Sequence, residues 1–446
     1  MLGTPSGLNL SWCLTGHPRG TAGNMAALRC GPRMALKTIN LSAIAHCQWL
    51  FLCENDKTQI MQTSDLRIAL FSGNYNMTVD GANKALNRLV GYLLKQGAQV
   101  RVYSPTVANP DFEPQGDLIS VPSVAFPNRP EYRFPLHFSA RVRRDIEAFN
   151  PNILHISSPD RVSRQAAAWA RRRNLPVICS VHTRFETYLQ YYHLSFAEPL
   201  MVAWLRKLYS LCDGLIAPSD SFADILRDQR MNRDIGIWTR GIDRDIFHPS
   251  RRDMAWRRNL GIADDMPVIA FLGRLVMEKG LDVFADSINE LARRGVRHDV
   301  VVIGEGPAGD WFKSRMPDAK FVGFQGGADL AKAVASCDIF FNPSVTETFG
   351  NVTLEAMACQ MPVVAARATG SASIVKHETT GFLVEPGNIV NFADRLQSYC
   401  EQPKLRAAHS HAALTESQKY DWDAINQVVV DTYVRLTKQR ANRRKA

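Results

Sequence analysis

Two glutamates separated by seven residues, Glu347 and Glu355, stand on either side of a predicted helix start. They follow an apolar run ending at Phe341 that is typical of a buried strand. Between them, Gly350 permits a close backbone approach, and a helix is predicted over 351–357. The free N–H groups and positive dipole end of that helix suit an anion such as a diphosphate. Carboxylates accept hydrogen bonds from sugar or ribose hydroxyls. The alternative is a loop glutamate followed by a solvated helix glutamate, because such a spacing often arises by chance.

Two cations lie in a polar loop that follows another predicted strand. Arg274 and Lys279 belong to the loop 273–280, directly after the apolar run 268–272. Arginine offers a planar fork of donors and lysine a point charge, so the pair can bind a phosphate or diphosphate group. We expect these cations to share a site with the two glutamates. A solvated basic loop is the alternative.

Strand and helix signals alternate in two series along the chain. The first series begins with a strand at 66–72, a polar loop, a helix that opens at Gly81 and a second strand at 99–103. This order is a βαβ unit, which predicts a parallel sheet. The remaining strands are predicted at 152–156, 176–182, 214–218 and 235–238 in the first series, and at 268–272, 299–304, 321–323, 339–341, 362–365 and 381–384 in the second.

The predicted fold class is α/β, with two doubly wound, Rossmann-like parallel-sheet domains facing across a cleft. Ligands of such sheets bind at the carboxyl ends of the strands, and with two facing sheets they bind between the domains. The predicted divisions are a disordered or non-native extension at 1–64 with Met61 as the native start, a first domain at 65–240, a linker at 241–253, a second domain at 254–420, and a C-terminal helix at 421–440 that packs back toward the first domain.

The composition of the chain limits the classes of protein to which it can belong. The 446 residues are 46% hydrophobic and 22% charged, as in ordinary globular proteins, and no apolar run has the length of a membrane span. The net charge of +10 allows attraction to an anionic membrane surface, whereas no nucleic-acid-binding signature accompanies it. Nine cysteines without a Cys-x-x-Cys pair indicate reduced thiols in a cytosolic protein.

Several motifs together resemble the donor site of the family-4 retaining glycosyltransferases, which have the GT-B fold. The resemblance rests on the Glu347 to Glu355 run, Gly273-Arg274-Leu275, Glu278-Lys279-Gly280 and Gly304-Glu305-Gly306-Pro307, and it extends from about Leu66 to Tyr433. It implies an acceptor-side first domain and a nucleotide-sugar-binding second domain. It also implies retaining hexosyl transfer from a nucleotide diphosphate sugar, without a protein nucleophile, a metal or another cofactor.

The resemblance assigns roles residue by residue. Glu355 matches the glutamate that accepts the nucleotide ribose hydroxyls, and Glu347 matches the one near the donor-sugar hydroxyls. Arg274 and Lys279 match the cations on the diphosphate. The backbone turn that faces sugar and phosphate is formed by Phe349, Gly350, Asn351 and Val352, and Asn351 stands where the family often has an apolar residue.

In the first domain, the resemblance singles out Gly81 and His182. Gly81 matches a glycine at the start of the helix beside the donor phosphate, and His182 matches a histidine near the donor sugar. We therefore expect His182, Arg274, Lys279 and Glu347 to act in catalysis, with His182 not serving as a base. A lone histidine at a strand end is otherwise more often structural.

The acceptor is expected to be a membrane lipid. The segment 74–90 is similar to the branch that includes mannosyl-, sulfoquinovosyl- and other lipid glycosyltransferases. Basic clusters at 141–144 and 171–173 indicate docking on the cytoplasmic face of an anionic membrane, with a solvated helix face as the alternative. The donor is expected to be GDP-mannose or a UDP-sugar. A polysaccharide or soluble acceptor, or a non-catalytic sugar-nucleotide-binding protein, remains the alternative, and a dinucleotide-dependent oxidoreductase is disfavoured because the required glycine motif is absent.

Overall fold

The computed structural model describes residues 61–77, 81–126, 129–185 and 195–445. The predicted extension at 1–64 lies almost wholly outside the described residues, and so do Cys13, Cys30, Cys47 and Cys53. The part of the chain from Met61 onward forms one unit, which begins with a 3₁₀ turn at Thr63–Asp65.

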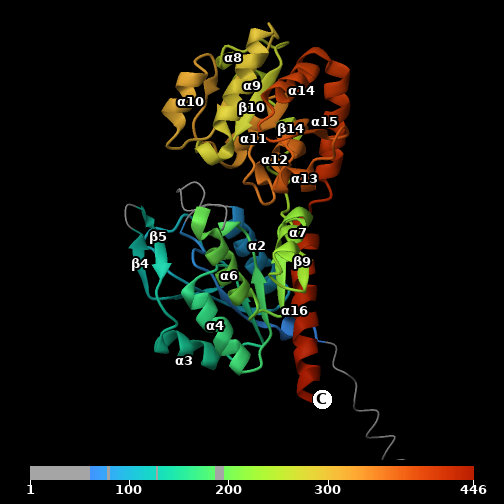
Figure 1. Ribbon diagram of the computed structural model, residues 1–446. Helices are drawn as coiled ribbons and strands as arrows, with labels where there is room; N and C mark the ends of the chain where they lie inside the picture. Colours follow the sequence, from blue (N-terminus) through green and yellow to red (C-terminus); the bar gives the residue numbers. More distant parts are fainter. Residues whose placement is uncertain (1–60, 78–80, 127–128, 186–194, 446) are drawn as a thin grey trace, which may run out of the picture. The chain divides into compact units, whose positions relative to one another are not determined.

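The first sheet has seven parallel strands in the order β3-β2-β1-β6-β7-β8-β9 (Figure 1). The central pair is β1 and β6, where the strand order reverses, so this is the switch point at which doubly wound sheets bind ligands. The strands are β1 Arg67–Phe71, β2 Gln99–Ser104, β3 Asp117–Ser120, β6 Ile153–Ile156, β7 Val177–Ser180, β8 Gly214–Ala217 and β9 Ile235–Ile237. The helices between them are α2 Gly81–Lys95, α3 Ala140–Phe149, α4 Arg161–Arg172, α6 Glu198–Tyr209 and α7 Asp220–Asp228.

The structure adds three strands that the sequence pattern did not predict. β3 extends the first sheet beyond β2, and β4 (Ser123–Phe126) pairs with β5 (Arg129–Pro135) in an antiparallel hairpin. β3 is an edge strand whose first and last residues, Asp117 and Ser120, are exposed. A short edge strand needs no continuous apolar run, because only one side of it is covered, and periodicity therefore misses it.

The second sheet is also parallel, with the order β12-β11-β10-β13-β14-β15 and its switch point between β10 and β13. Its strands are β10 Val268–Leu272, β11 Asp299–Ile303, β12 Lys320–Phe321, β13 Ile339–Asn342, β14 Val363–Ala366 and β15 Gly381–Val384. Its helices are α8 Met254–Asn259, α9 Leu281–Arg293, α10 Gly309–Arg315, α11 Gly327–Ala335, α12 Asn351–Ala358, α13 Thr369–Ile374, α14 Ile389–Glu401 and α15 Pro403–Ser417. The predicted two-sheet α/β fold is confirmed.

Both faces of the second sheet are covered, which explains the continuous apolar runs of its strands. Along β10, Val268 and Ala270 belong to one buried cluster, whereas Ile269 and Phe271 belong to the cluster on the opposite face. Phe271 makes an edge-to-face contact with Phe284 of α9, with ring centroids 5.3 Å apart. A parallel strand buried on both faces is apolar at every position, so it shows no period of two.

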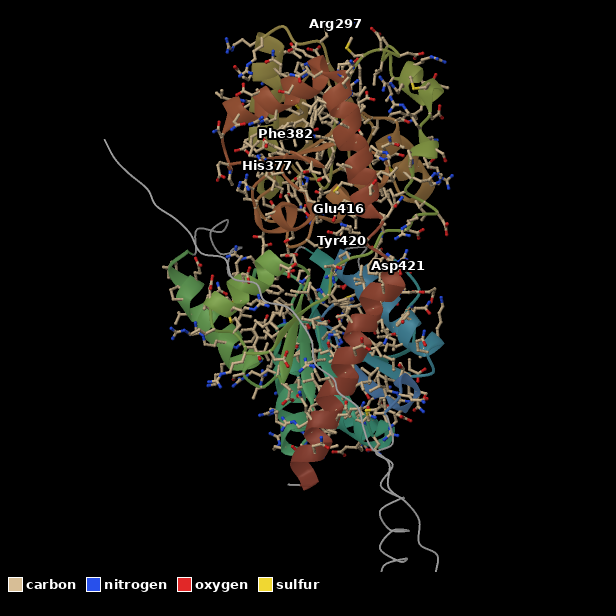
Figure 2. The ribbon with its side chains drawn as sticks, turned by 90° about the vertical axis from the view of Figure 1, so that its right-hand side faces the viewer. Arg297, His377, Phe382, Glu416, Tyr420 and Asp421 are labelled. Carbon is tan, nitrogen blue, oxygen red and sulfur yellow. The ribbon has the colours of Figure 1, made fainter. Side chains whose placement is uncertain are left out.

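The chain passes between the two sheets twice, and the two passages are hydrogen-bonded to each other. Ile242 donates its N–H to the carbonyl of Tyr420 (3.0 Å), and Figure 2 labels Tyr420 and Asp421 at the second passage. A Cβ on Gly241 would lie 2.5 Å from the Trp422 ring, so only glycine allows this approach.

The last helix, α16 (Trp422–Lys445), packs on the first sheet domain. Its apolar side chains Ile425, Val429 and Tyr433 share one buried cluster with Ile68 of β1 and Leu89 of α2. The spacing of these residues at three and four positions is that of one helix face. The described residues therefore begin and end on the same domain.

Candidate active site

The loops that follow β10 and β13 meet at the switch point of the second sheet. Lys279 Nζ lies 2.7 Å from Glu347 Oε1, and both side chains are mostly shielded from solvent. The Thr346 hydroxyl donates to the carbonyl of Glu278 (3.2 Å), which ties the two loops together a second time. Two of the residues predicted for one site are thus in direct contact, and a cation stands beside a carboxylate where phosphate and sugar are expected.

Glycines allow the Arg274 loop to lie against the loop that follows β11. A Cβ on Gly304 would lie 2.0 Å from the Gly273 carbonyl oxygen, and a Cβ on Gly306 would lie 2.4 Å from that of Leu275. The two loops are also joined by a backbone hydrogen bond, in which the Leu275 N–H donates to the carbonyl of Glu305 (2.9 Å). The predicted Gly-Glu-Gly-Pro turn therefore supports the cation loop, and the Arg274 side chain itself is exposed.

The helix that carries Glu355 begins as the sequence predicts. Gly350 has φ of 99°, a left-handed conformation that favours glycine, and α12 starts at the next residue. Glu355 is half-buried in the second turn. Burial raises its pKa to about 7, Lys84 of α2 acts in the opposite direction, and the charge of Glu347 adds to the rise. Glu355 is therefore partly shielded from solvent, unlike a glutamate on a fully solvated helix face.

The start of α2 lies against the start of α12. A Cβ on Gly81 would lie 2.1 Å from Asn351 Nδ2, so the glycine leaves the room that the Asn351 amide occupies. Gly81 and Asn351, which were predicted in separate domains, thus meet where α2 and α12 begin. Each of these helix N-termini presents free N–H groups and a positive dipole end. This arrangement suits an anionic ligand.

The other two residues predicted on the turn point into the protein core. Phe349 is buried and makes an edge-to-face contact with Tyr420, with ring centroids 5.8 Å apart. Val352 is half-buried and packs on the core of the second domain. The Phe349 side chain is thus used in packing, so a contact from that position to a ligand would come from the backbone.

His182 follows β7 and reaches the Glu347 loop. Its carbonyl oxygen accepts a hydrogen bond from the hydroxyl of Thr348 (2.9 Å). Its Nδ1 lies 2.8 Å from a guanidinium nitrogen of Arg240, and its ring makes an edge-to-face contact with Trp238 at 5.7 Å. Burial, and then the charge of Arg240, holds the pKa of His182 well below its usual value, so the imidazole is neutral at physiological pH.

The two basic clusters differ in their surroundings. Arg141, Arg143 and Arg144 are exposed on α3. In the other cluster, Arg171 pairs with Asp213 (3.0 Å) and Arg173 pairs with Glu147. Much of the positive charge of the 171–173 cluster is therefore neutralised within the protein, and the α3 cluster presents more of its charge to solvent.

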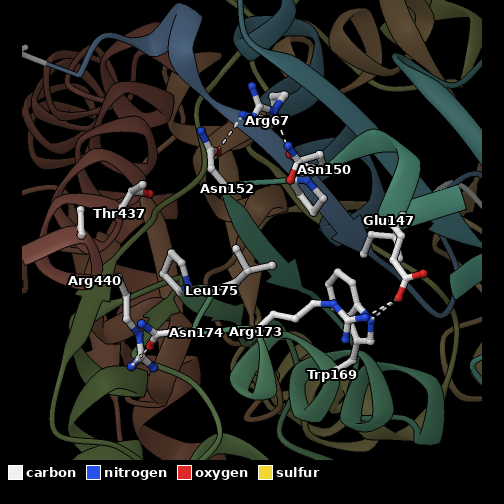
Figure 3. A pocket seen from close by; sticks show the side chains of 14 residues that line it. Arg67, Glu147, Asn150, Asn152, Trp169, Arg173, Asn174, Leu175, Thr437 and Arg440 are labelled. Carbon is white, nitrogen blue, oxygen red and sulfur yellow. Dashed lines mark hydrogen bonds and ion pairs between the residues drawn. The ribbon is translucent and has the colours of Figure 1, made fainter. Parts of the chain in front are cut away.

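The ion pair between Arg173 and Glu147 borders a cavity of about 370 Å³ at the amino ends of the first-sheet strands (Figure 3). Arg173 stacks over Trp169 at 4.5 Å, and the Nε of Arg67 donates to the Asn150 carbonyl (2.8 Å). This cavity lies at the opposite strand ends from His182, so it is separate from the candidate site.

Three residues near the site were missed by the sequence pattern. Lys84, Trp238 and Arg240 belong to a helix face, a strand end and the last position of the predicted first domain, where a single charged or aromatic residue is unremarkable. The sequence offered only a weak signal for Arg240, a cation that stands two residues after the predicted strand at 235–238. The contact with His182 is long-range in sequence and needs the fold.

Within the described ranges, no group of three or more His, Cys, Asp or Glu side chains is placed to hold a metal ion. No helix in that part of the chain combines the length and apolarity needed to cross a membrane. The five described cysteines, Cys179, Cys212, Cys337, Cys359 and Cys400, form no disulfide with one another.

Comparisons with known proteins find relatives over most of the chain. Residues 79–246 match the family Glycosyltransferase Family 4, and residues 266–402 match Glycosyl transferases group 1. The chain is 30% identical to the GDP-mannose-dependent alpha-mannosyltransferase of Corynebacterium glutamicum, over 82% of this chain and 88% of that protein. It is also 30% identical to the sulfoquinovosyl transferase of Arabidopsis thaliana (80% and 71% covered).

A third relative, the alpha-monoglucosyldiacylglycerol synthase of Streptococcus pneumoniae, is 25% identical, with 67% of this chain and 71% of that protein covered. The solved structure of a sucrose-phosphate synthase from Thermosynechococcus elongatus superposes with a TM-score of 0.69 at 19% identity, covering 83% of this chain and 99% of that one. The structural likeness shows the shared GT-B fold.

Proposed function

The chain belongs to glycosyltransferase family 4, and we propose that it transfers a hexosyl unit from a nucleotide diphosphate sugar to a hydroxyl acceptor with retention of configuration. The observation that carries this proposal is the 2.7 Å contact between Lys279 and Glu347 at the switch point of the second sheet. A cation for phosphate and a carboxylate for hydroxyls stand side by side there, with the N-termini of α2 and α12 close by.

In the proposed binding mode, different site residues bind the ribose, the diphosphate and the sugar of the donor. Glu355 accepts hydrogen bonds from the ribose hydroxyls, and Lys279 and Arg274 hold the diphosphate. Glu347 accepts hydrogen bonds from the donor sugar, which displaces part of its contact with Lys279. With two cations on the diphosphate, leaving-group charge is neutralised by the protein itself, and we propose that the reaction needs no divalent metal and no other cofactor.

The proposed reaction is a front-side displacement. The acceptor oxygen forms a bond to the anomeric carbon on the face from which the diphosphate departs, while the bond from that carbon to the phosphate oxygen breaks. The acceptor proton passes to the departing phosphate oxygen, so no protein base or nucleophile is required. The protein contributes positioning and charge stabilisation, which suffice for large rate effects when the groups are held in place.

The donor and the acceptor are proposed from the relatives. The Corynebacterium glutamicum relative is named for GDP-mannose, which makes GDP-mannose a first candidate donor, with UDP-sugars as the second. The Streptococcus pneumoniae relative is named for a glucosyldiacylglycerol product, which favours a membrane glycolipid or diacylglycerol as acceptor. Soluble acceptors, polysaccharide acceptors and sugar-nucleotide binding without turnover are the competing functions.

A screen of nucleotide sugars tests the proposal directly. We expect one GDP-, UDP- or ADP-sugar to raise the melting temperature of the purified chain, since a ligand that binds the native state stabilises it. The same sugar should be transferred to a component of a membrane lipid extract, with an α-linked product when the donor is α-linked. If none of these nucleotide sugars binds, the assignment as a nucleotide-sugar enzyme fails. Binding without transfer to lipid or soluble acceptors would favour the non-catalytic function.

Exposed apolar side chains of the first domain support peripheral binding at a membrane. Phe196, in the 3₁₀ turn Ser195–Ala197 before α6, is 78% exposed, Leu200 on α6 is 73% exposed, and Phe134 on β5 is 54% exposed. Large apolar side chains are unfavourable in water and insert readily into the headgroup region of a bilayer. We propose that this domain docks on the membrane and receives the lipid acceptor there.

The double substitution Phe196→Ser/Leu200→Ser is expected to lower partitioning onto vesicles with anionic lipid by about tenfold or more, given the transfer free energy of two large apolar side chains. Cosedimentation with vesicles measures the effect. The control is Val390→Ser on α14 of the second domain, which removes a 58% exposed apolar side chain and should leave partitioning unchanged. Equal partitioning of the double variant and the wild type would exclude this docking surface.

A further inference from the structure

We propose that Arg240 is a positioning residue that holds His182 as the neutral tautomer with its proton on Nε2, so that His182 presents an N–H donor to the sugar in the active site. The inference rests on the proposed function for the site around His182 and deepens it. Arg240 lies in the segment between the two sheets, 58 residues away in sequence from His182.

The tautomer follows from the chemistry of the two partners. A nitrogen of the Arg240 guanidinium lies 2.8 Å from His182 Nδ1. A guanidinium has N–H donors only and stays charged at every physiological pH, so Nδ1 must be the acceptor and must carry a lone pair. A neutral imidazole with a lone pair on Nδ1 has its proton on Nε2.

Arg240 is itself held in place by packing and hydrogen bonds. It is 5% exposed, and its Nη1 donates to the carbonyls of Trp238 (2.8 Å) and Thr239 (3.1 Å). Its guanidinium stacks over the Trp238 ring at 4.8 Å, and that ring also contacts His182 edge-to-face. The Trp238 Nε1 donates to Asn426 of α16 (3.3 Å), which fixes the indole in turn. Arg240 therefore has little freedom to release Nδ1.

The second ring nitrogen of His182 is available for a ligand. Nε2 is buried and has no hydrogen-bond partner among the described residues. Burying an N–H without a partner is unfavourable, so such a group usually has a function that a static protein contact does not fulfil. The histidine of the neighbouring strand shows the contrast, because His155 uses both nitrogens within the protein, toward Tyr433 (2.6 Å) and Ser180 (2.9 Å).

The place of His182 makes the donor sugar the fitting acceptor for this N–H. Its own carbonyl is hydrogen-bonded to Thr348, the residue after Glu347. The main chain of His182 is therefore tied to the loop whose carboxylate is proposed to bind sugar hydroxyls. A hydroxyl both donates and accepts, so one sugar hydroxyl can accept from Nε2 while another donates to Glu347.

The contact between Arg240 and His182 also argues against a role for His182 as a base. A base acting through Nε2 would need the proton on Nδ1, which would then point at the guanidinium donors of Arg240. The protonated imidazolium meets the same repulsion. His182 thus acts as a neutral hydrogen-bond donor during transfer, and the acceptor proton leaves by another route.

Nitrogen-15 NMR of the full chain with labelled histidine tests the tautomer, with His182→Gln used to identify the His182 resonances. In the wild type, we expect the Nδ1 signal in the unprotonated range and the Nε2 signal in the protonated range. Arg240→Met should convert His182 to a mixture of tautomers, since the guanidinium donors are lost while an unbranched side chain remains over Trp238. A wild-type spectrum with the proton on Nδ1, or an unchanged Arg240→Met spectrum, would overturn the proposal.

The kinetic readout separates positioning from folding. Arg240→Met is expected to lower kcat by about tenfold or more with a smaller change in KM for the nucleotide sugar. Arg240→Lys, which keeps a cationic donor, should recover part of the loss. Arg244→Met removes an exposed arginine of the same segment and serves as the control. Wild-type kcat in Arg240→Met contradicts the inference, whereas absence of turnover in the wild type refutes the proposed function and leaves the tautomer measurable.

Discussion

Replacing Lys279 by alanine is expected to lower kcat/KM for the nucleotide sugar by about 10²–10³-fold, the usual cost of removing one group that stabilises charge in the transition state. Lys279 is the cation that contacts Glu347, at 2.7 Å, at the switch point of the second sheet. Charge on the diphosphate grows as the sugar leaves, so most of the loss should appear in kcat. Steady-state transfer kinetics with saturating acceptor measure the effect.

A stable fold must accompany the loss of activity for the result to be informative. Removal of Lys279 leaves Glu347 as a largely shielded carboxylate without that partner, so the melting temperature should be recorded for each variant. Arg297→Ala is the matched control, because Arg297 forms an exposed ion pair with Asp265 (3.4 Å) on the same domain. If Lys279→Ala turns over as fast as Arg297→Ala, then Lys279 has no part in the mechanism.

Replacing Glu355 by glutamine is expected to raise the Kd of the nucleoside diphosphate by about 10- to 100-fold at pH 8, because hydrogen bonds to a charged acceptor are roughly twice as strong as neutral ones. The wild type should also bind with a marked pH dependence, since burial raises the pKa of Glu355 to about 7. The ionised fraction falls from about nine tenths at pH 8 to about one tenth at pH 6, so the wild-type Kd should rise roughly tenfold over this range.

Calorimetric titration at several pH values distinguishes this role from a general loss of folding. Glu355→Gln should bind equally weakly at pH 6 and pH 8, while Glu401→Gln, an exposed glutamate of α14, should behave as the wild type. A raised pKa means that the native state holds this proton better than the unfolded chain does. The stability from Glu355 is therefore present below pH 4.5 and is lost as the pH rises through about 7. A pH-independent wild-type Kd would contradict the proposed contact with the ribose.

The strand and helix pattern predicted the two-sheet fold, because residues in parallel strands are buried on both faces and form apolar runs. β10 and β15 were predicted with the bounds that the structure has. The hairpin of β4 and β5 and the edge strand β3 were missed, since strands with little burial leave no such pattern. A strand is thus predictable from sequence to the degree that burial requires an apolar residue at each of its positions.

Local sequence also determined which residues could form the site, since Glu347, Gly350 and Glu355 are related by a strand end, a turn and a helix within nine residues. Only the tertiary structure decided the environment of each group: that Lys279 lies on Glu347, that Glu355 is buried enough to titrate near neutrality, and that Arg240 holds one nitrogen of His182. Hydrogen-bond partners and pKa values depend on distance and burial across many residues of chain, which spacing along a sequence does not encode.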